Sequence, residues 1–402
     1  EIRFDGFTED WEQRKLGDNI VEYTEKTTEN NQYPVLTSSR KGIFFQTDYY
    51  DGNQIASADN TGYKIVTYGY FTYRHMSDDE IFHFNINDIA ENGIVSTLYP
   101  VFTTDENLDS RYLQYQLNYG REFARYAILQ KQGGSRTYMY LNKLRNLYLT
   151  VPTAIEEQKK ISEYFTNLDH LITLHQRKYD ETKTLKKYML QKMFPQNGEK
   201  VPEIRFDGFT EDWEQRKLGE VCEIKDSARI PNSEWSESGI PYIRASDVTN
   251  ENTDGVLFIS QERYEFYKNR TGAPTKNDVL FNGGGEIGKS LLITDEKPIY
   301  VQGGAVLYAR TSKSRELVGQ YLKTYFETTN AKSYIDAASA GGTMRHFTLK
   351  PSQKMRILMP SVEEQEKIGG YFVNLDRLIT LHQRKCNELK EIKKYMLQNM
   401  FV

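Results

Sequence analysis

The chain contains the same seventeen residues twice. The segment EIRFDGFTEDWEQRKLG occupies positions 1–17 and, without a single change, positions 203–219. A second pair of copies, 156–194 and 363–401, is identical at 28 of 39 positions. The segments between the copies show little similarity. A chain built in this way offers one kind of surface twice and two unlike surfaces once each.

Bulk composition sets the class of protein. The 402 residues suffice for two or three domains, each with its own hydrophobic core. A charged fraction of 27% and a mean hydropathy of −0.69 are typical of a soluble globular protein. No apolar run approaches the roughly 20 residues that span a bilayer, so no membrane is expected. Cys222 and Cys386 form no paired motif and the histidines have no zinc spacing, so we expect a reducing cytoplasm and no bound metal.

The two EEQ segments predict long helices that pair as a coiled coil. Residues of the expected seam recur with alternating spacings of four and three in each segment. The seam is predicted to consist of Ile161, Phe165, Leu168, Ile172 and His175 in the first helix, and Ile368, Phe372, Leu375, Ile379 and His382 in the second. We interpret the two histidines as polar residues that set the register.

Lengths favour an antiparallel pair. Each helix of about 40 residues is about 60 Å long, whereas the turn-rich linker 195–202 reaches at most about 28 Å. A parallel pair would force the second middle segment to span the whole rod. The predicted organisation is a first domain at 1–152, a first helix at 153–194, a second domain at 203–360 and a second helix at 361–402.

The middle segments are predicted to be mixed α/β domains, so that the fold class is α+β. The runs GIFFQTDYY, YKIVTYGYFTY and YVQGGAVLYA are rich in β-branched and aromatic residues and favour strands. The stretches 109–131 and 315–337 favour helices with apolar faces. A pseudo-two-fold axis through the centre of the antiparallel rod would relate the two domains, one at each end.

The charge distribution points to an anionic ligand. A net charge of −4 excludes a protein that coats nucleic acid through bulk charge, and residues 1–155 hold 15 basic and 21 acidic side chains. However, the windows 123–155 and 337–362 contain several Lys and Arg and no Asp or Glu. Their recurrence at the same place in each half favours a ligand met once per half. Fluctuation of surface charge is the alternative interpretation.

Each basic window carries a short motif of glycines, a hydroxyl and an arginine. Glycine lets backbone amides approach a phosphate, the hydroxyl can donate to it, and arginine can fork onto phosphate or guanine. The candidates are Lys131, Gly133, Gly134, Ser135, Arg136 and Tyr138 in the first window, and Gly341, Gly342, Thr343, Arg345 and His346 in the second. A glycine hairpin that packs the domain onto its helix is the alternative.

Two further segments place hydroxyl groups beside cations. TSSRK at 37–41 supplies Arg40 and Lys41, and YIRASD at 242–247 supplies Arg244 and Ser246. These side chains could contact base edges or phosphates, or form solvated strand ends.

The segment GGGEIGKS at 283–290 matches the nucleotide-binding pattern G-x-x-x-x-G-K-[ST]. In such a loop Lys289 would reach the β/γ-phosphates and Ser290 would hold Mg²⁺. The context favours a hairpin, because LLIT runs directly into DEKP and no helix can follow the loop. Lys289 could then approach a phosphate of another polymer. Nucleophile elbow, HExxH and paired-carboxylate patterns are also absent from the sequence, which predicts a non-catalytic chain.

With these features in place, the chain resembles the specificity subunit of type I restriction–modification enzymes. The doubled architecture carries the resemblance, together with FTEDWEQRKLG, the EEQ-x-K-I helix starts and VLFNGGGEIGKS. It extends over essentially the whole chain.

The resemblance implies two target recognition domains, each reading one half of a split and asymmetric site in double-stranded DNA. It implies that the shared regions bind two methyltransferase subunits, which methylate adenine N6 with S-adenosylmethionine. Motor–nuclease subunits that use ATP and Mg would join for restriction, so no cofactor is expected on this cytoplasmic chain. The alternatives are a P-loop NTPase and a coiled-coil scaffold without sequence readout.

Overall fold

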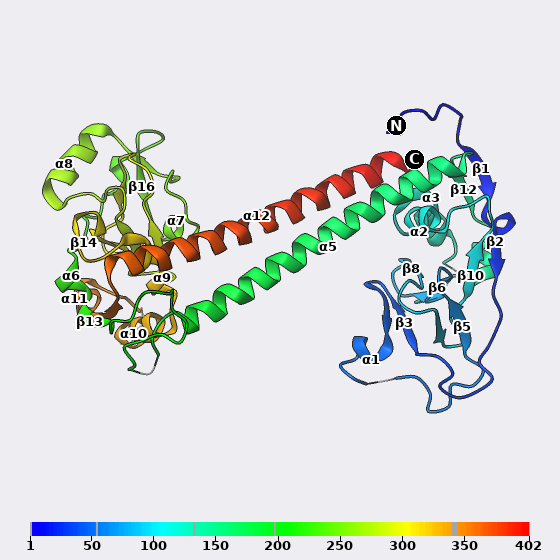
Figure 1. Cartoon of the computed structure of the whole chain (residues 1–402). Helices are drawn as coiled ribbons and strands as arrows, with labels where there is room; N and C mark the ends of the chain where they lie inside the picture. Colours follow the sequence, from blue (N-terminus) through cyan, green and yellow to red (C-terminus); the bar gives the residue numbers. More distant parts are fainter. Residues whose placement is uncertain (1, 54, 132–133, 197, 340–344, 402) are drawn as a thin grey trace. The chain divides into compact units, whose positions relative to one another are not determined.

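A computed structural model describes residues 2–53, 55–131, 134–196, 198–339 and 345–401. The chain divides into two compact units (Figure 1): unit 1 comprises Glu1–Gln176 and Arg384–Val402, and unit 2 comprises Arg177–Gln383. Each unit therefore contains one middle segment and parts of both long helices. The boundaries predicted from the sequence assign each helix to a separate segment and stay a prediction.

Unit 1 is built on an antiparallel sheet with the strand order β2–β10–β6–β8. These strands are Ile20–Glu22, Val101–Thr104, Phe71–Tyr73 and Phe84–Ile86. Four two-stranded pairs surround it: β1–β12 (Glu12–Lys15, Tyr148–Val151), β3–β4 (Leu36–Ser39, Gly42–Phe45), β5–β9 (Lys64–Thr67, Asn92–Val95) and β7–β11 (Met76–Ser77, Thr137–Tyr138). The short helices are η1 (Leu16–Asp18), α1 (Gln46–Tyr49), α2 (Ser110–Tyr119), α3 (Arg121–Leu129) and α4 (Leu141–Leu144).

An aromatic core joins the unit 1 sheet to α2 and α3. Phe71 and Phe102, on neighbouring strands, stack with ring centroids 4.6 Å apart. Phe84 of the edge strand meets Phe123 of α3 edge to face at 5.0 Å. Large rings of this kind bury much apolar surface at few positions, which allows short strands to form a stable domain.

Unit 2 contains the corresponding sheet in the order β14–β21–β18–β19. These strands are Ile224–Asp226, Val306–Ala309, Val279–Asn282 and Ser290–Leu292. A second sheet has the order β15–β17–β16–β20 (Trp235–Ser236, Phe258–Ile259, Ile240–Ile243, Tyr300–Val301), and β13 (Glu214–Lys217) pairs with β22 (Arg356–Met359). The helices are α6 (Leu218–Val221), η2 (Asn232–Glu234), α7 (Ala245–Thr249), α8 (Gln261–Thr271), η3 (Thr311–Lys313), α9 (Gly319–Phe326), α10 (Thr329–Ser339) and α11 (Leu349–Lys354).

The repeated sequences form the same contacts in both units. In unit 1, Nε and Nη2 of Arg3 donate to the two oxygens of Glu157 at 2.6 and 2.7 Å. In unit 2, Arg205 donates in the same way to Glu364 at 2.8 Å for both bonds. Each copy of the seventeen-residue segment is thereby fixed to the start of a long helix by a charge-assisted fork.

The glutamine of each EEQ sequence completes this frame. Gln158 accepts a hydrogen bond from the Asp109 backbone and donates to the carbonyl of the proline before its helix, both at 2.9 Å. Gln365 accepts from the Val318 backbone at 2.9 Å and donates to the equivalent proline carbonyl at 3.0 Å. Both glutamine side chains are buried and cannot bond to water. These hydrogen bonds therefore satisfy their polar groups within the protein.

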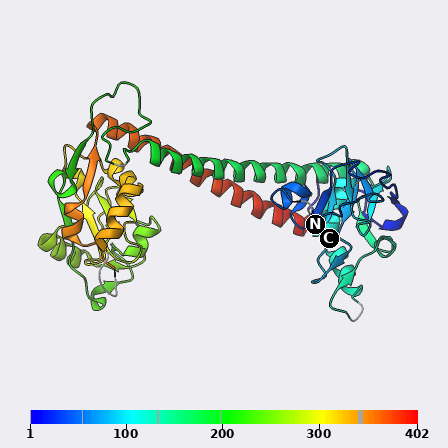
Figure 2. The same ribbon diagram turned by 90° about the horizontal axis from the view of Figure 1, so that it is seen from below.

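The long helices α5 (Ile155–Lys192) and α12 (Val362–Met400) are antiparallel within unit 1. Phe165 packs on Phe401 with centroids 5.7 Å apart, and Asp169 pairs with Lys393 at 2.5 Å. Residue numbers therefore rise along α5 as they fall along α12. In Figures 1 and 2 the red end of α12 lies beside the first turns of α5.

The same two helices are antiparallel within unit 2. Lys186 pairs with Asp376 at 2.7 Å, and Phe194 packs on Phe372 with centroids 6.1 Å apart. The predicted antiparallel pairing is confirmed in each unit. No helix in the described ranges has the length and apolar character required to cross a bilayer.

The predicted seam residues fall into two groups. Ile161, Phe165 and Leu168 are buried in the unit 1 core, and Ile368, Phe372 and Leu375 are buried in the unit 2 core. The remaining positions, Ile172, His175, Ile379 and His382, are half-buried. The first turns of each helix therefore belong to the core of a unit. The seam residues that follow them are less deeply buried.

The two predicted helical stretches are confirmed, each divided into two helices, and one predicted strand is shorter than expected. The stretch 109–131 forms two helices, because the backbone of Gly120 is extended and a Cβ there would lie 2.4 Å from the Gln116 carbonyl oxygen. The stretch 315–337 is likewise divided between α9 and α10. The expected strand 42–50 ends at Phe45, after which the chain turns into α1 as the backbone of Gln46 bonds Val35.

Candidate DNA-binding surfaces

The predicted cations of unit 1 meet at one acidic segment. Asp78, Asp79 and Glu80 follow β7 directly, and each holds one cation from elsewhere in the sequence. The pairs are Arg136–Asp78 (Nε–Oδ1 2.8 Å), Arg40–Asp79 (Nη1–Oδ2 2.8 Å) and Lys131–Glu80 (Nζ–Oε1 2.5 Å). Lys131 and Arg136 of the first acid-free window are thus paired with acids from another segment.

These pairs lie at the protein surface. Their side chains are exposed or half-exposed, so solvent screens each pair and it contributes little to stability. Hydrogen bonds from Arg40 and Ser77 hold the pKa of Asp79 well below its ordinary value, which keeps this carboxylate charged. A DNA phosphate could replace the carboxylates as the partner of the three cations without a large cost.

Arg40 and Lys41 also border a cleft of about 510 Å³. They occupy the turn of the β3–β4 hairpin, and Ser38 and Ser39 supply hydroxyl groups to the same wall. The remaining lining includes five residues that the sequence did not single out: Tyr49, Tyr50, Arg74, His83 and Tyr99. No Asp or Glu occurs among the described residues that line this cleft.

The cleft residues were missed because they come from separate segments with no shared local motif. The pKa of His83 is lowered mainly by burial. The positive charges of nearby Arg40 and Lys393 lower this pKa further. His83 is therefore neutral near pH 7, and the positive charge of the cleft comes from the arginines and Lys41.

An aromatic face lies beside these cations. The pairing of β11 with β7 places Tyr138 opposite Met76. Tyr138 is stacked with Tyr140 at 5.9 Å, and Tyr140 with His75 at 5.1 Å. Both tyrosines are exposed, as are Gly134 and Ser135 before the strand, whereas Gly133 lies outside the described residues.

Three candidate segments of unit 2 converge on a glycine loop. The Asn282 side chain donates to the Ala245 carbonyl at 2.9 Å, which joins the loop to the segment of Arg244 and Ser246. The Phe347 backbone donates to the Gly283 carbonyl at 2.8 Å, which joins it to the segment that follows Arg345. Folding therefore brings together residues that are about a hundred positions apart in the sequence.

The predicted cations of unit 2 are also paired with acids. The pairs are Arg244–Asp247 (Nε–Oδ2 3.1 Å), Lys289–Glu286 (Nζ–Oε2 4.0 Å) and Arg345–Asp336 (Nη2–Oδ1 2.9 Å). Ser246 and His346 are exposed near these pairs. Gly341, Gly342 and Thr343 lie outside the described residues.

The nucleotide-binding pattern at 283–290 is a hairpin loop, as the sequence context predicted. Strands β18 and β19 pair antiparallel, with Phe281 opposite Ser290, and the backbone of Asn282 donates to Lys289 at 2.8 Å. No helix follows the loop, so the backbone amides that cradle phosphates in a P-loop are not presented at a helix start.

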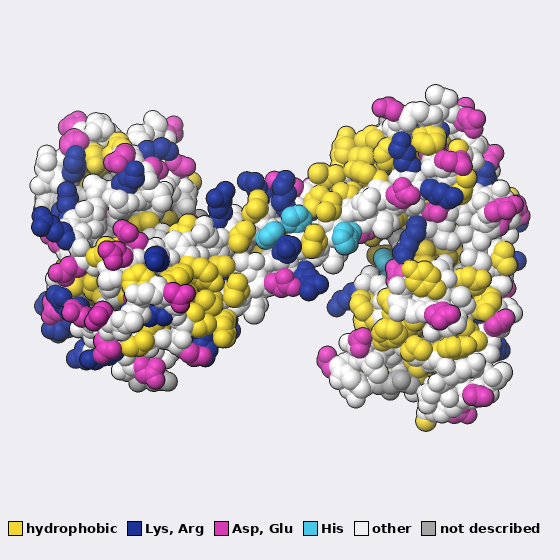
Figure 3. Space-filling view, in the orientation of Figure 1, with side chains coloured by type: hydrophobic (Ala, Val, Ile, Leu, Met, Phe, Trp, Pro, Cys, Tyr) yellow, Lys and Arg dark blue, Asp and Glu magenta, His cyan; other side chains and the backbone are white. Residues whose placement is uncertain are grey.

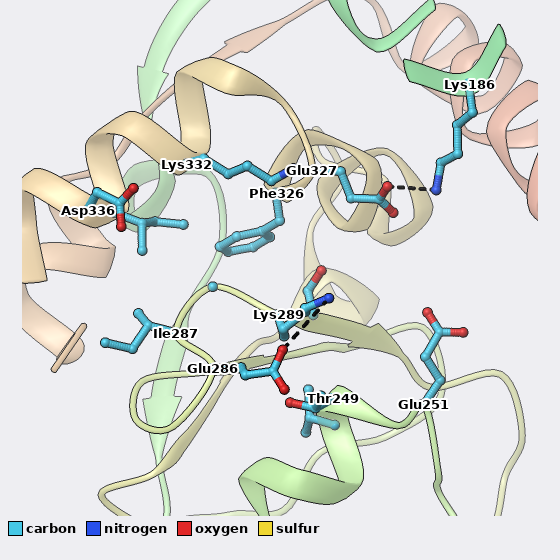
Figure 4. A pocket seen from close by; sticks show the side chains of 14 residues that line it. Lys186, Thr249, Glu251, Glu286, Ile287, Lys289, Phe326, Glu327, Lys332 and Asp336 are labelled. Carbon is cyan, nitrogen blue, oxygen red and sulfur yellow. Dashed lines mark ion pairs between the residues drawn. The ribbon is translucent and has the colours of Figure 1, made fainter. Parts of the chain in front are cut away.

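The pocket beside this loop has the wrong charge for a triphosphate. It has a volume of about 560 Å³ and is shown in Figure 4. Its charged lining comprises Lys186, Lys289 and Lys332 against Glu251, Glu286, Glu327 and Asp336. Lys186 is itself held by Glu327 at 2.6 Å. Four carboxylates around one pocket would repel a nucleotide phosphate chain.

Mixed charge is general on this protein. In Figure 3 Lys and Arg side chains lie beside Asp and Glu over much of the face shown. Within the described ranges, no three His, Cys, Asp or Glu side chains gather as metal ligands would. The arrangement suits recognition of a polymer by exchange of ion pairs.

Comparison with known proteins accounts for the duplication. The family model described as type I restriction modification DNA specificity domain matches residues 8–184 and again residues 210–391. The chain belongs to this family. Two consecutive specificity domains thus cover the repeated segments and both middle segments.

Relatives of this family align with nearly the whole chain. The type I restriction enzyme MjaVIII specificity subunit of Methanocaldococcus jannaschii is 22% identical over 77% of this chain and 73% of its own length. The putative MjaX specificity subunit of the same organism is 22% identical over 97% of this chain and 92% of its own. The chain is a specificity subunit of the type I restriction–modification class.

The fold agrees with this assignment. The crystal structure of a type I restriction–modification S subunit from M. genitalium aligns with 99% of this chain and 97% of its own, with a TM-score of 0.58 at 13% identity. The predicted fold class, α+β with two related mixed domains and long antiparallel helices, is confirmed.

Proposed function

We propose that this specificity subunit reads an asymmetric, two-part site in double-stranded DNA, with one half-site bound by each unit. The supporting observation is the contrast within the chain: the Arg–Glu fork and the buried glutamine are reproduced in both units, whereas the cation surfaces differ. Shared contacts fix the framework, and unlike surfaces contact unlike DNA.

The proposal assigns catalysis to partner subunits. Two methyltransferase subunits would bind the framework, which occurs twice, and would methylate adenine N6 with S-adenosylmethionine. Motor–nuclease subunits would bring ATP and Mg for restriction, and the complex would act in the cytoplasm. The net charge of −4 supports a division of labour in which partner subunits supply much of the contact to phosphates.

The test is to make the two surfaces identical. The unit 1 segment 18–147 is replaced by the unit 2 segment 220–355, which leaves β1, β12 and the Arg3–Glu157 fork in place. The incoming Val318 backbone, which bonds Gln365 in unit 2, takes the place of Asp109 as the donor to Gln158. Methylated adenines are then mapped by sequencing DNA from cells that carry the chain with its methyltransferase partner. We expect an asymmetric target for the natural chain and a palindromic target, built from one half-site twice, for the duplicated chain.

The reciprocal exchange is the matched control. A chain in which the two middle segments trade places keeps both cation surfaces and the repeated framework contacts, so we expect it to methylate the same target as the natural chain. A target that is unchanged in the duplicated chain would favour a scaffold without sequence readout. Absence of sequence-dependent adenine methylation in the natural complex would refute the proposal.

A further inference from the structure

The four candidate arginines differ in which edge of the guanidinium is held. A guanidinium reads guanine by directing two parallel N–H donors at O6 and N7, so an arginine must keep one two-donor edge open. Its direction must also be fixed, because a mobile side chain loses entropy on binding. These two requirements separate Arg244 from Arg40, Arg136 and Arg345.

Arg244 meets both requirements. Its Nε donates to Oδ2 of Asp247 at 3.1 Å and its Nη2 to Oδ1 at 3.3 Å. The Asp247 side chain is only 5% exposed and also accepts from the Arg244 backbone at 2.9 Å. One edge of the guanidinium is thus anchored on a buried carboxylate. Among the described residues no acceptor holds Nη1, so the edge formed by Nη1 and Nη2 stays open.

The Arg244 side chain is partly accessible beside a glycine loop. The Arg244 side chain is one-third exposed, at 33%. The adjoining loop carries three consecutive glycines at 283–285, and a Cβ on Gly285 would lie 3.7 Å from the Ala245 side chain. Glycines at such a point allow a DNA groove to come close to the backbone.

The other arginines lack one requirement each. Asp79 holds Arg40 through both Nη1 and Nη2, so the terminal edge of Arg40 is already occupied. Asp78, which holds Arg136 at Nε, is 62% exposed and does not fix the side chain. Arg345 is held by an exposed carboxylate as well.

We propose that Arg244 is a specificity-determining residue that reads a guanine in the major groove of the half-site bound by unit 2, and that Asp247 is the residue that positions it. This inference rests on the proposed DNA-reading function and adds the base and the atoms involved. It predicts at least one G·C pair in the unit 2 half-site.

The experiment uses the full chain assembled with its methyltransferase partner and a fluorescent duplex that carries the mapped target. Each guanine of the unit 2 half-site is replaced in turn by 7-deazaguanine, which lacks the N7 acceptor. At one position we expect the natural chain to lose about tenfold in affinity, since a two-bond contact loses one bond. Arg244→Lys, whose ammonium lacks the fixed two-donor fork, should bind the natural duplex about tenfold more weakly and lose less affinity with that analogue than the natural chain does.

Two more variants separate positioning from folding. Asp247→Asn keeps an acceptor for the Arg244 backbone but loses the charge, so we expect weaker discrimination against the analogue with binding to a scrambled duplex retained. Arg40→Lys, a matched change in unit 1, should keep the full effect of the analogue.

The outcomes distinguish the inference from the function on which it rests. A natural complex that prefers its target but shows no N7 dependence, or an equal dependence in Arg244→Lys, would overturn the role of Arg244 alone. A unit 2 half-site without G·C pairs would do the same. A natural complex with no preference for its target over the scrambled duplex would overturn both proposals.

Discussion

Unit 1 and unit 2 hold their long helices through equivalent contacts but present their cations in different ways. In unit 1 a single acidic segment, Asp78–Glu80, pairs with Arg40, Lys131 and Arg136. In unit 2 each candidate cation has its own acid, and the segments meet at a glycine hairpin. The residues that are identical in the two units form the contacts of the frame, whereas the residues that differ form the surfaces that carry the cations.

This pairing also reconciles a negative chain with DNA recognition. In both units the candidate Arg side chains are held by carboxylates before any DNA is bound. For the exposed pairs of Arg40, Arg136 and Arg345, binding then exchanges one ion pair for another, so the net gain per phosphate is small and depends on salt. Such a surface discriminates through the direction of its donors more than through bulk attraction.

The largest expected effect tests the equivalence of the two frames. Arg205→Ala would leave Glu364, 1% exposed, without its partner, and we expect the free energy of unfolding to fall by about 3–5 kcal/mol. Arg3→Ala should cost less, because Arg3 is 28% exposed against 11% for Arg205, and Trp11 also donates to Glu157. Denaturant unfolding followed by circular dichroism measures both.

The control for this pair neutralises the stranded acid. Adding Glu364→Gln to Arg205→Ala should recover part of the loss, since a buried amide costs less than a buried charge. Equal and small losses for the two arginine variants would contradict the view that the fork supports each unit.

The next effect tests the separation of the two DNA surfaces. Arg136→Ala should weaken binding to the unit 1 half-site and Arg345→Ala to the unit 2 half-site through a lost phosphate contact, and each should reduce the salt slope of binding by about 1. Arg177→Ala, an exposed helix arginine paired with Glu181, serves as the control. Binding is measured with duplexes in which one half-site is scrambled. Unchanged DNA affinity of the assembled complex would show that neither arginine belongs to the DNA-binding surface.

A smaller effect separates the units by pH. Burial raises the pKa of the Cys222 thiol to about 12. In the unfolded chain the pKa of a cysteine thiol is about 8.5. The neutral thiol therefore contributes its full stability below about pH 8.5, and this contribution falls by at most about 1.4 kcal/mol per pH unit as the pH rises toward 12. Residues 1–155 contain no cysteine, so the first middle segment has no thiol that titrates in this way.

The measurement compares denaturant midpoints of the natural chain and Cys222→Ala between pH 8 and pH 10. We expect the alanine variant to lose stability less steeply with rising pH. Parallel curves would show that the thiol has the same pKa in the folded and the unfolded chain. The thiol would then not be buried in the core of unit 2.

The smallest expected effect concerns Lys289. Because the loop is a hairpin beside a pocket with four carboxylates, the chain should not bind ATP with Mg, and Lys289→Ala should change nothing in a calorimetric titration. Measurable ATP binding by the natural chain that is lost in Lys289→Ala would restore the nucleotide-binding interpretation.

The sequence by itself determined the framework. Exact repetition, the periodic apolar residues of the helices and the short linker predicted two related domains with antiparallel helices, because these features depend on local period and chain length. The residues after Lys289 likewise predicted a hairpin, since a helix cannot form across DEKP. The order β2–β10–β6–β8 could not be predicted in this way, because its neighbours are remote along the chain.

Only the tertiary structure decided how the candidate residues are used. Asp78 reaches Arg136 across 58 positions, and Glu80 reaches Lys131 of the same acid-free window. The occupied edge of Arg40 follows from where Asp79, 39 positions away, lies in space. Asp247 follows Arg244 by only three positions, but the burial of its carboxylate, which anchors one edge of Arg244, depends on the fold. The direction of a side chain is set by packing between distant segments, and no local pattern in the sequence records it.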